Sequence, residues 1–497
     1  MKKGKIINII SIVITVLVTT IGVLVTSKYS KSFIPVSNSN IKLDIDMSRW
    51  SYDVDNNVYY QMQVNYCSKP RVPKLQTLGI YVPGEYLNGI ENKDKTYSCK
   101  INKNGKRAGY TSELAPIIIS VNTEDYKAQD EPEEYKYSAI SDYIESGYIY
   151  IQPGFRGKVE SNQEQDNEHY SKEIIESVTD LKAVVKFCRF NKDKLPGNSE
   201  KIISFGINGG GTKSAILGAS GDSELYYSEL LSIGAIINDL NGNWISDSVN
   251  GTMCCSPILN LEMTEESYAW SIEQYLNKKN SGLNEEILDN VSRYANYIND
   301  MNFKSEDGTL LYLEESDTGI YNKGTYYDYI LNEVELALNK FLVNTEFPYT
   351  NKKRNITYKT PKEYINSLNN KNKWVIEKAN IDQIRMSGIK DFVLNCYSDS
   401  TKKVKKILSE ETNPLYFLSN KYDGEGSSYI SRHWNICSEV DSNNIDLSSE
   451  ENLKLVLQNN EDVRKVNYTA FWGREYSLEE KEKMYVENLK SWIKECF

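Results

Sequence analysis

The most constraining feature of the sequence is a buried strand that runs directly into a sharp turn and then a helix. Residues 201–205 are apolar with strand character, residues 206–210 are almost all small, and residues 212–219 continue as a helical run. Other short apolar runs are typical of strands buried on both faces, and they lie at residues 78–82, 116–121 and 147–152. Residues 174–189 between them repeat apolar side chains at helical spacing. This alternation predicts an α/β fold with a mostly parallel sheet and flanking helices.

The turn has the layout of a nucleophile elbow, in which a central side chain stands between small residues two positions away on either side. Gly206, Gly209 and Gly210 supply the small residues, and Asn208 stands at the centre. Small residues are needed because the strand and the helix approach closely at this bend. Asparagine tolerates a positive φ better than most residues, so Asn208 keeps the expected backbone shape while it removes the nucleophilic hydroxyl.

Around this turn the chain resembles the bacterial tannases, within the wider tannase and feruloyl-esterase-like α/β hydrolases. Residues 206–222, GINGGGTKSAILGASGD, are similar to the family's elbow. Residues 148–157, YIYIQPGFRG, and 255–270, CSPILNLEMTEESYAW, are similar to two further family segments. Weaker similarity continues at residues 180–189, 196–197, 324–342, 434–452 and 467–480. The resemblance covers most of residues 75–495 and implies an α/β-hydrolase fold with a helical lid.

Carried over position by position, the resemblance implies a catalytic triad that is no longer complete. The family's serine falls on Asn208, and the family's histidine falls on Tyr476. A tyrosine titrates near 10 in water and cannot replace imidazole as a proton shuttle at neutral pH. The family's aspartate falls near Asp441, but an ungapped register places Ser442 or Asn444 there instead, so these alternatives stay open.

The loop expected to supply oxyanion donors is also altered. Asn122 and Thr123 follow the strand at 116–121 and, with Gly209, are the candidate donors. Glu124 and Asp125 come next, where the tannases have glycines. Two carboxylates near a developing oxyanion would oppose it by charge repulsion. We therefore expect a weak oxyanion hole.

No cofactor or metal is expected. The chain has two histidines, His169 in a polar stretch that we interpret as a loop at 163–170, and His433, at spacings that no zinc site uses. His433 precedes the predicted strand residue Trp434, so we expect it to have no catalytic role. Eight cysteines are spread along the chain without a C-x-x-C pair. A Cys67–Cys99 bridge and two buried thiols both remain open as interpretations.

The amino terminus predicts a membrane anchor. Three lysines precede residues 6–25, which carry no charge and are rich in Ile, Val and Leu. At about 1.5 Å per residue this run can cross a hydrocarbon core of about 30 Å. We expect residues 1–26 to be a retained single-pass transmembrane helix with the amino terminus inside, because no A-x-A-type cleavage site follows. Residues 27–56 are polar and predict a tether to a folded part outside the cell.

The remaining chain divides by composition into a core and an insertion. Residues 57–262 and 387–497 have the core's strand and helix patterns. Residues 263–386 are dense in Asn, Lys, Glu and Tyr, as expected of a helical lid, with long polar helices predicted at 324–343 and 373–385. Within the second core segment we expect a strand at 466–472 and a helix at 478–492. The net charge of −11 and the pI near 5.1 argue against a nucleic-acid partner, which would need a positive surface.

Together these features predict a membrane-anchored, extracytoplasmic pseudo-esterase. The expected pocket beneath the lid would bind a small ester, a phenolic compound or a peptide without cleaving it. Two alternatives stay open. One is an active carboxylic-ester hydrolase with a rearranged site, although the lid at 263–386 contains no histidine. The other is a surface interaction module that docks a partner through the tyrosine-rich lid.

Overall fold

The fold is described from a computed structural model of the chain. It describes residues 42–123, 126–157, 167–257, 259, 263, 266–267, 269–270, 285–317, 319–351, 356–364, 410–439, 447–471 and 478–497. Within these ranges no helix is long and apolar enough to span a membrane. The predicted span at residues 6–25 lies outside them, and so does the tether up to residue 41.

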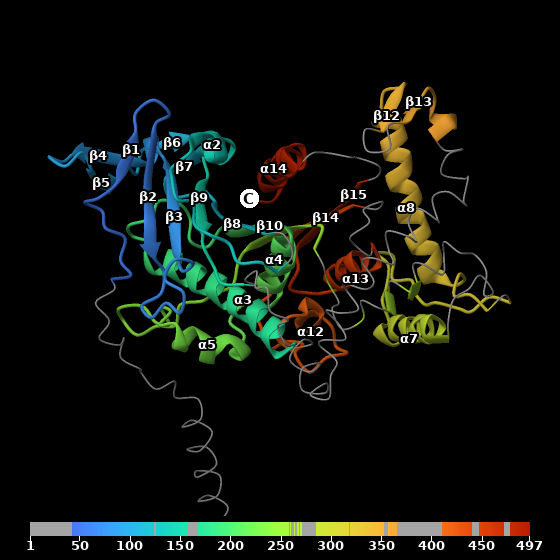
Figure 1. Ribbon diagram of the computed structural model, residues 1–497. Coiled ribbons are helices and arrows are strands. Elements are labelled where there is room, and N and C mark those ends of the chain that lie inside the picture. The colour runs from blue at the N-terminus through green and yellow to red at the C-terminus, as the bar shows by residue number, and fades with distance from the viewer. Residues whose placement is uncertain are drawn as a thin grey trace, which may run out of the picture.

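A twisted nine-stranded sheet forms the centre of the protein (Figure 1). From one edge to the other, its strands are β1 (Ser51–Asp53), β2 (Val58–Asn65), β3 (Thr77–Pro83), β9 (Ile149–Pro153), β8 (Ile117–Thr123), β10 (Ile202–Asn208), β11 (Gly251–Cys255), β14 (His433–Glu439) and β15 (Lys465–Phe471). The six strands from β9 to β15 run parallel to one another. The order agrees with the prediction of a mostly parallel sheet.

Helices cover both faces of the sheet, which accounts for the continuous apolar strands. On one face lie α2 (Tyr137–Glu145) and α14 (Leu478–Cys496), whose apolar side chains share a core cluster with β10 and β11. On the other face lie α3 (Asn167–Phe190), α4 (Gly209–Ala219), α12 (Pro414–Leu418) and α13 (Leu447–Gln458), with α5 (Tyr227–Ser232) packed on α3. Strands such as β8 bury isoleucines toward both layers, as expected for a sheet covered on both sides.

The strands and helices predicted from apolar patterns are confirmed, with one error of direction. β3, β8, β9, β10 and β15 coincide with predicted strands, and α3, α4, α8 and α14 with predicted helices. However, β3 pairs antiparallel with both β2 and β9. Burial on both faces makes an antiparallel strand as uniformly apolar as a parallel one, so composition alone could not reveal its direction.

The amino-terminal part of the described chain corrects one expectation and decides between two interpretations of Cys67 and Cys99, in favour of buried thiols. Residues 42–56 are not a free tether, because Ile45 and Trp50 are buried and β1 pairs with β2. Apolar residues alternate there at Leu43, Ile45 and Met47 and again at Trp50, Tyr52 and Val54, a strand-like signal that the polar composition of the segment hid. Two hairpins follow, β4 (Leu87–Glu91) with β5 (Tyr97–Ile101), and β6 (Lys106–Arg107) with β7 (Tyr110–Thr111). Cys67 and Cys99 are both free, so the bridge between them is absent.

The described part of the predicted lid consists of α7 (Glu285–Met301), α8 (Thr325–Asn344) and the hairpin β12 (Tyr349–Asn351)–β13 (Ile356–Tyr358). The hairpin was not expected. Three lid tyrosines donate hydrogen bonds of 2.6–2.8 Å to side chains of α13, from Tyr294 to Ser448, Tyr326 to Asn452 and Tyr329 to Glu451. Part of the tyrosine richness therefore serves to dock the lid, with apolar rings packed inside and hydroxyls bonded. The helix-like stretch at 373–385 lies outside the described residues.

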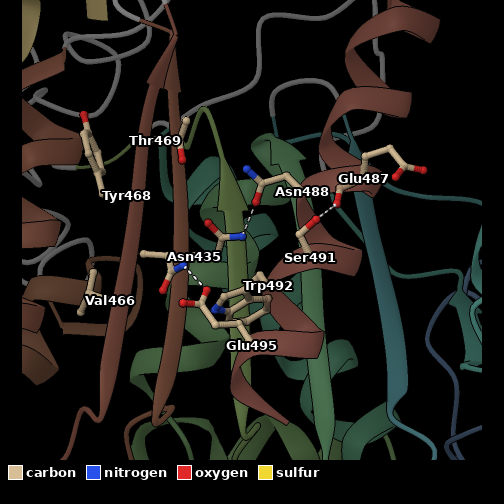
Figure 2. Close-up of a pocket in the computed structure, with 10 residues that line it drawn as sticks. Asn435, Val466, Tyr468, Thr469, Glu487, Asn488, Ser491, Trp492 and Glu495 are labelled. Carbon is tan, nitrogen blue, oxygen red and sulfur yellow. Dashed lines mark hydrogen bonds between the residues drawn. The ribbon is translucent and has the colours of Figure 1, made fainter. Parts of the chain in front are cut away.

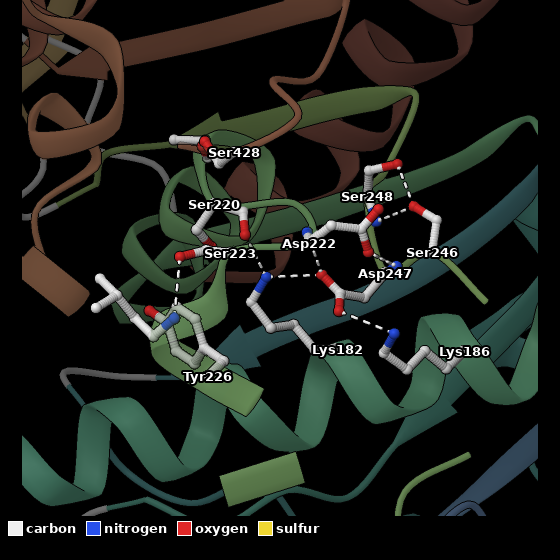
Figure 3. Close-up of polar contacts among 12 residues, drawn as sticks. Lys182, Lys186, Ser220, Asp222, Ser223, Tyr226, Ser246, Asp247, Ser248 and Ser428 are labelled. Carbon is white, nitrogen blue, oxygen red and sulfur yellow. Dashed lines mark hydrogen bonds and ion pairs between the residues drawn. The ribbon is translucent and has the colours of Figure 1, made fainter. Parts of the chain in front are cut away.

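At its carboxyl end, α4 is tied to α3 by a buried ionic network (Figure 3). Lys182 Nζ lies 2.8 Å from Asp247 Oδ1 and 2.5 Å from the carbonyl oxygen of Ser220, which follows α4. Lys186 Nζ lies 3.3 Å from Asp247 Oδ2. The amide of Asp222 donates to Asp247 Oδ1 at 2.8 Å. All three charged side chains are at most 2% exposed, so the network is a structural joint rather than a solvent-facing site.

Candidate active site

The elbow is present in the backbone although its nucleophile is absent. Asn208 ends β10 and precedes α4, with φ of 53° and ψ of −122°. The positive φ agrees with the prediction, but ψ lies well outside the left-handed helical region that asparagine usually adopts. Asparagine is a favoured N-cap, yet the Asn208 side chain makes no capping hydrogen bond to α4. Helix capping therefore does not explain the asparagine.

Close backbone approaches enforce this conformation. A Cβ on Gly210 would lie 1.6 Å from the carbonyl oxygen of Val121 in β8, and one on Gly206 would lie 2.1 Å from the carbonyl oxygen of Gly210. A Cβ on Gly211 would lie 2.7 Å from the carbonyl oxygen of Cys255 in β11. These distances are shorter than any real contact of a methyl group, so the positions require glycine. α4 is buried along its whole length, which leaves no room to relieve a clash.

The carboxyl ends of the parallel strands gather at one edge of the sheet, around the elbow. Asn208 pairs with Thr123 of β8, and its neighbour Ile207 pairs with Cys255 of β11. On the far side, Glu439 of β14 pairs with Phe471 of β15. In an open α/β sheet, ligands bind at this edge. The acid candidates Asp441, Ser442 and Asn444 and the base position Tyr476 lie outside the described residues.

The oxyanion candidates are placed differently from the prediction. Asn122 and Thr123 are the last residues of β8, not the start of a loop. The amide of Asn122 donates to Gln129 Oε1 at 2.8 Å, so it is not available to an oxyanion. Gly209 opens α4 directly after the elbow, where the fold places one oxyanion donor. Glu124 and Asp125 lie outside the described residues, so their expected repulsion stays a prediction.

Lys213, which the sequence analysis missed, joins α4 to the end of β8. Its ammonium donates to Thr123 Oγ1 at 3.0 Å and to the carbonyl oxygen of Lys127 at 2.7 Å, and lies 4.9 Å from the centre of the Phe155 ring. The side chain is fully buried. A positive charge one turn into the elbow helix adds to the partial positive charge of the helix amino terminus. A lysine inside an apolar helical run was the available signal.

Neither histidine is shown to serve the elbow. His433 begins β14, at the opposite end of the strand from Glu439, about 20 Å away at about 3.3 Å per residue. Its imidazole packs 4.8 Å from the Phe497 ring, and burial together with nearby arginines and Lys465 lowers its pKa. This placement agrees with the expectation that it has no catalytic role. His169 lies in α3 rather than in the predicted loop.

Other hydroxyl and thiol groups near the edge are buried within the sheet and α4. Ser204 and Ser214 are fully buried, and Ser256, which follows β11, is 1% exposed. Burial raises the pKa of Cys255 well above its ordinary value, with Cys437 beside it raising it further. A thiol in that state forms little thiolate at neutral pH. Among the described residues, no group of His, Cys, Asp and Glu is arranged to hold a metal ion.

The chain was compared with known protein families, sequences and solved structures. No family model and no curated protein sequence matches the chain. Solved structures do match over most of its length. Fusobacterium nucleatum tannase gives a TM-score of 0.62 at 19% identity, covering 90% of this chain and 99% of that one. The chain has the fold of a tannase.

Two further structures agree with the tannase fold. Tannin acyl hydrolase from Lactobacillus plantarum gives a TM-score of 0.57 at 17% identity, covering 87% of this chain and 94% of that one. A tannin acyl hydrolase in complex with ethyl gallate gives 0.58 at 18% identity, again with 87% and 94% covered. The resemblance noted in the sequence is therefore confirmed at the level of the fold, and the α/β-hydrolase architecture with it. At sequence identities of 17–19%, the roles of individual residues in the tannases cannot be assigned to residues of this chain.

Proposed function

We propose that this tannase-fold chain is catalytically inactive and that its elbow site binds, without cleaving, a small ester, phenolic or peptide ligand. One observation carries the proposal. Asn208 occupies the elbow tip with φ of 53° and ψ of −122°, so the strained backbone of a nucleophile site is kept around a side chain that cannot attack. An amide has neither an ionisable proton nor a nucleophilic oxygen of the kind that acyl transfer needs.

The described surroundings offer no replacement nucleophile at the elbow. Ser204, Ser214 and Ser256 are at most 1% exposed, and the raised pKa of Cys255 disfavours its thiolate. The proposal further holds that Tyr476 cannot act as the base. An active ester hydrolase with a rearranged site would need both a nucleophile and a base from elsewhere, so it is the weaker alternative.

The charges around the elbow favour a ligand that presents oxygen atoms. The amino terminus of α4 carries partial positive charge, and the buried ammonium of Lys213 lies one turn further along. Asn208 itself carries both hydrogen-bond donors and an acceptor. A carbonyl, carboxylate or phenolic oxygen held at this point would be stabilised without being attacked.

We also propose that residues 6–25 anchor the chain in the cell membrane and that the folded part lies outside. The uncharged run after Lys2, Lys3 and Lys5 supports this, because its length matches a bilayer and the positive charges favour the inner side. Protease protection of a carboxyl-terminal tag in intact cells is the direct test. A tag that resists protease added outside, but is cleaved after the cells are opened, would contradict the orientation.

Ester turnover tests the main proposal. Wild type, Asn208→Ala, Asn208→Ser and the double variant Asn208→Ser, Tyr476→His are assayed with ethyl gallate and p-nitrophenyl acetate. We expect wild type and Asn208→Ala to stay at background. We expect the double variant to exceed wild type by about 100-fold, since nucleophile and base are both restored.

Calorimetry with ethyl gallate provides the binding readout, and we expect wild type to bind it. Wild-type hydrolysis that disappears in Asn208→Ala would overturn the proposal. So would an acyl adduct found on the wild-type chain by mass spectrometry.

A second candidate function is supported by the outer surface of the lid. Leu331, Leu336 and Val343 of α8 are 42%, 55% and 84% exposed. Leu336 and Val343 lie seven positions apart, so they share one face of the helix, and a contiguous exposed apolar patch is typical of a contact surface for another protein. A photo-crosslinker at position 343, compared with one at Lys340, tests this role in intact membranes. Equal crosslinking at both positions would argue against a specific surface.

A further inference from the structure

A cavity lies away from the elbow, between the last two strands and the last helix. Its volume is about 630 Å³, within the range of about 300–1,000 Å³ that small-molecule sites occupy. Figure 2 shows side chains of β14 and β15 facing α14 across this crevice. Three asparagines contribute to the walls: Asn435 from β14, Asn467 from β15 and Asn488 from α14. Asn435 Nδ2 donates to Asn488 Oδ1 at 2.6 Å, which ties the strand to the helix.

Three polar atoms of these walls are buried without a hydrogen-bond partner. They are the acceptors Asn435 Oδ1 and Asn467 Oδ1 and the donor Trp492 Nε1. Asn435 is 1% exposed and Trp492 is 2% exposed. Buried polar groups are nearly always hydrogen-bonded in folded proteins, because leaving them unpaired costs free energy. Three such atoms around one cavity indicate an occupant that supplies both donors and acceptors.

Both carboxylates that line the crevice form ion pairs, and the lysine that pairs with Glu487 also pairs with Asp142, at 3.0 Å. Glu495 forms an ion pair with Lys465, and its other oxygen accepts from Asn467 Nδ2 at 3.0 Å. Glu487 lies 2.6 Å from Lys490. A charged ligand would have to disturb these pairs, so the lining suits a neutral molecule.

We propose that this crevice binds a neutral polyhydroxylated small molecule, such as a monosaccharide. A hydroxyl group both donates and accepts, so neighbouring hydroxyls can satisfy the two amide oxygens and the indole nitrogen together. A carboxylate has no proton for the amide oxygens, and a phosphate monoester has lost most of its own at neutral pH. An ammonium group has no lone pair for the indole. The amide of Asn488 adds further donors of the kind that hold a ring hydroxyl.

The crevice is separate from the elbow. Asn435 pairs with Met253 of β11, whose other neighbour is Phe205 of β10. Phe205 lies three residues before Asn208, about 10 Å along the strand at about 3.3 Å per residue. The crevice also lies on the α14 face of the sheet, while α4 covers the opposite face. The two proposals can therefore fail independently: a result against ligand binding at the elbow does not count against the crevice, and a result against the crevice does not count against the elbow.

Saturation-transfer NMR on the full-length chain in detergent tests the proposal. The probes are D-glucose, D-galactose and myo-inositol at millimolar concentration, with D-glucuronate and D-glucosamine as charged comparisons. We expect signals from at least one neutral probe and weaker ones from its charged comparison. Asn435→Leu removes a polar group from the crevice wall at similar volume, and we expect it to weaken binding about tenfold or more.

Two further variants keep the test decisive. Asn467→Ala changes a less buried wall residue and should weaken binding even if Asn435→Leu fails to fold. Asn459→Leu, just after α13, bonds to Lys304 and Leu455 and does not line the crevice, so it should bind as wild type does. The proposal is overturned if no neutral probe gives a signal, if the crevice variants bind unchanged, or if a crystal grown with the probe shows only water there.

Discussion

The two ends of α4 are held in place by opposite means. At the amino-terminal end, Gly206 and Gly210 have no side chain, so the backbone of the helix packs directly against the backbones of β10 and β8. The backbone of Asn208 is strained there. At the carboxyl-terminal end, Lys182 reaches the carbonyl of Ser220 while it is paired with Asp247. We call the first contact, which close backbone packing makes, the shape-held joint. We call the second contact, which Lys182, Lys186 and Asp247 make, the charge-held joint.

This difference explains how the elbow backbone can form around an asparagine. The distances that fix the turn involve the backbones of Gly206 and Gly210 and the carbonyl of Val121, and none involves the side chain at 208. The identity of the side chain at 208 therefore does not alter the constraint. At the other end the constraint is the side chains themselves, so a single change there removes it.

The sharpest test of the shape-held joint is Gly210→Ala. The new Cβ would lie 1.6 Å from the carbonyl oxygen of Val121, a backbone atom in the middle of the sheet. We expect a loss of more than about 4 kcal/mol in the free energy of unfolding, or failure to fold. Urea unfolding followed by circular dichroism measures it. Gly242→Ala is the control, because a Cβ there meets no atom within 4 Å and only the φ of +83° costs stability, about 1 kcal/mol. Equal losses of unfolding free energy in the two variants would contradict the proposal that close backbone packing holds this joint.

The charge-held joint is tested by Asp247→Asn. The substitution keeps the shape but leaves Lys182 and Lys186 buried without their carboxylate. We expect a loss of about 3–5 kcal/mol, since breaking a buried pair leaves uncompensated charge. The same unfolding experiment applies. Asp193→Asn, at an exposed position, should change stability by less than about 0.5 kcal/mol. If the Asp247 variant matched this control, the network would contribute nothing to the joint.

The two joints also differ in how far the sequence revealed them. The shape-held joint was predictable, because a buried strand, Gly206, Gly209, Gly210 and a helical run are adjacent in the chain. The charge-held joint was not. Lys182 and Asp247 are 65 positions apart, and a lysine on a helix that also carries Asp180, Lys186 and Arg189 gives no indication of its partner.

Other elements were likewise predictable from the sequence where their pattern is local, and not where it depends on distant residues. Short apolar runs gave β8, β9 and β10, because burial on both faces produces a local pattern. The antiparallel direction of β3 depends on distant segments and left no local trace, whereas the buried Trp50 lies in a short apolar alternation that the polar surroundings hid. At the site, the identity of the side chain at 208 came from sequence alone, whereas the use of the Asn122 amide by Gln129 required the fold.

Acid should weaken the charge-held joint specifically. Burial alone would raise the pKa of Asp247, but Lys182 and Lys186 outweigh it and hold that pKa below its ordinary value. The folded protein therefore binds fewer protons here than the unfolded chain, whose value is about 3.9. The stabilisation is complete above that pH and is lost as pH falls through the lower folded-state pKa. We expect the stability difference between wild type and Asp247→Asn to be constant from pH 7 to about pH 5 and to shrink below about pH 4. A difference that stays constant at lower pH would contradict this origin.

The smallest expected effect is a gain in stability from Asn208→Gly. A non-glycine residue in so sparsely populated a conformation stores about 1–3 kcal/mol, and glycine relieves it at a cost of about 0.5–1 kcal/mol in unfolded-chain entropy. We therefore expect stabilisation of about 1 kcal/mol by urea unfolding. Asn104→Gly is the matched control at an exposed asparagine without positive φ, and it should lower stability by about 0.5–1 kcal/mol. If both variants lost stability equally, Asn208 would carry no strain. A gain at 208 alone would mean that the elbow keeps a costly geometry at Asn208, as expected if Gly206 and Gly210 impose the bend.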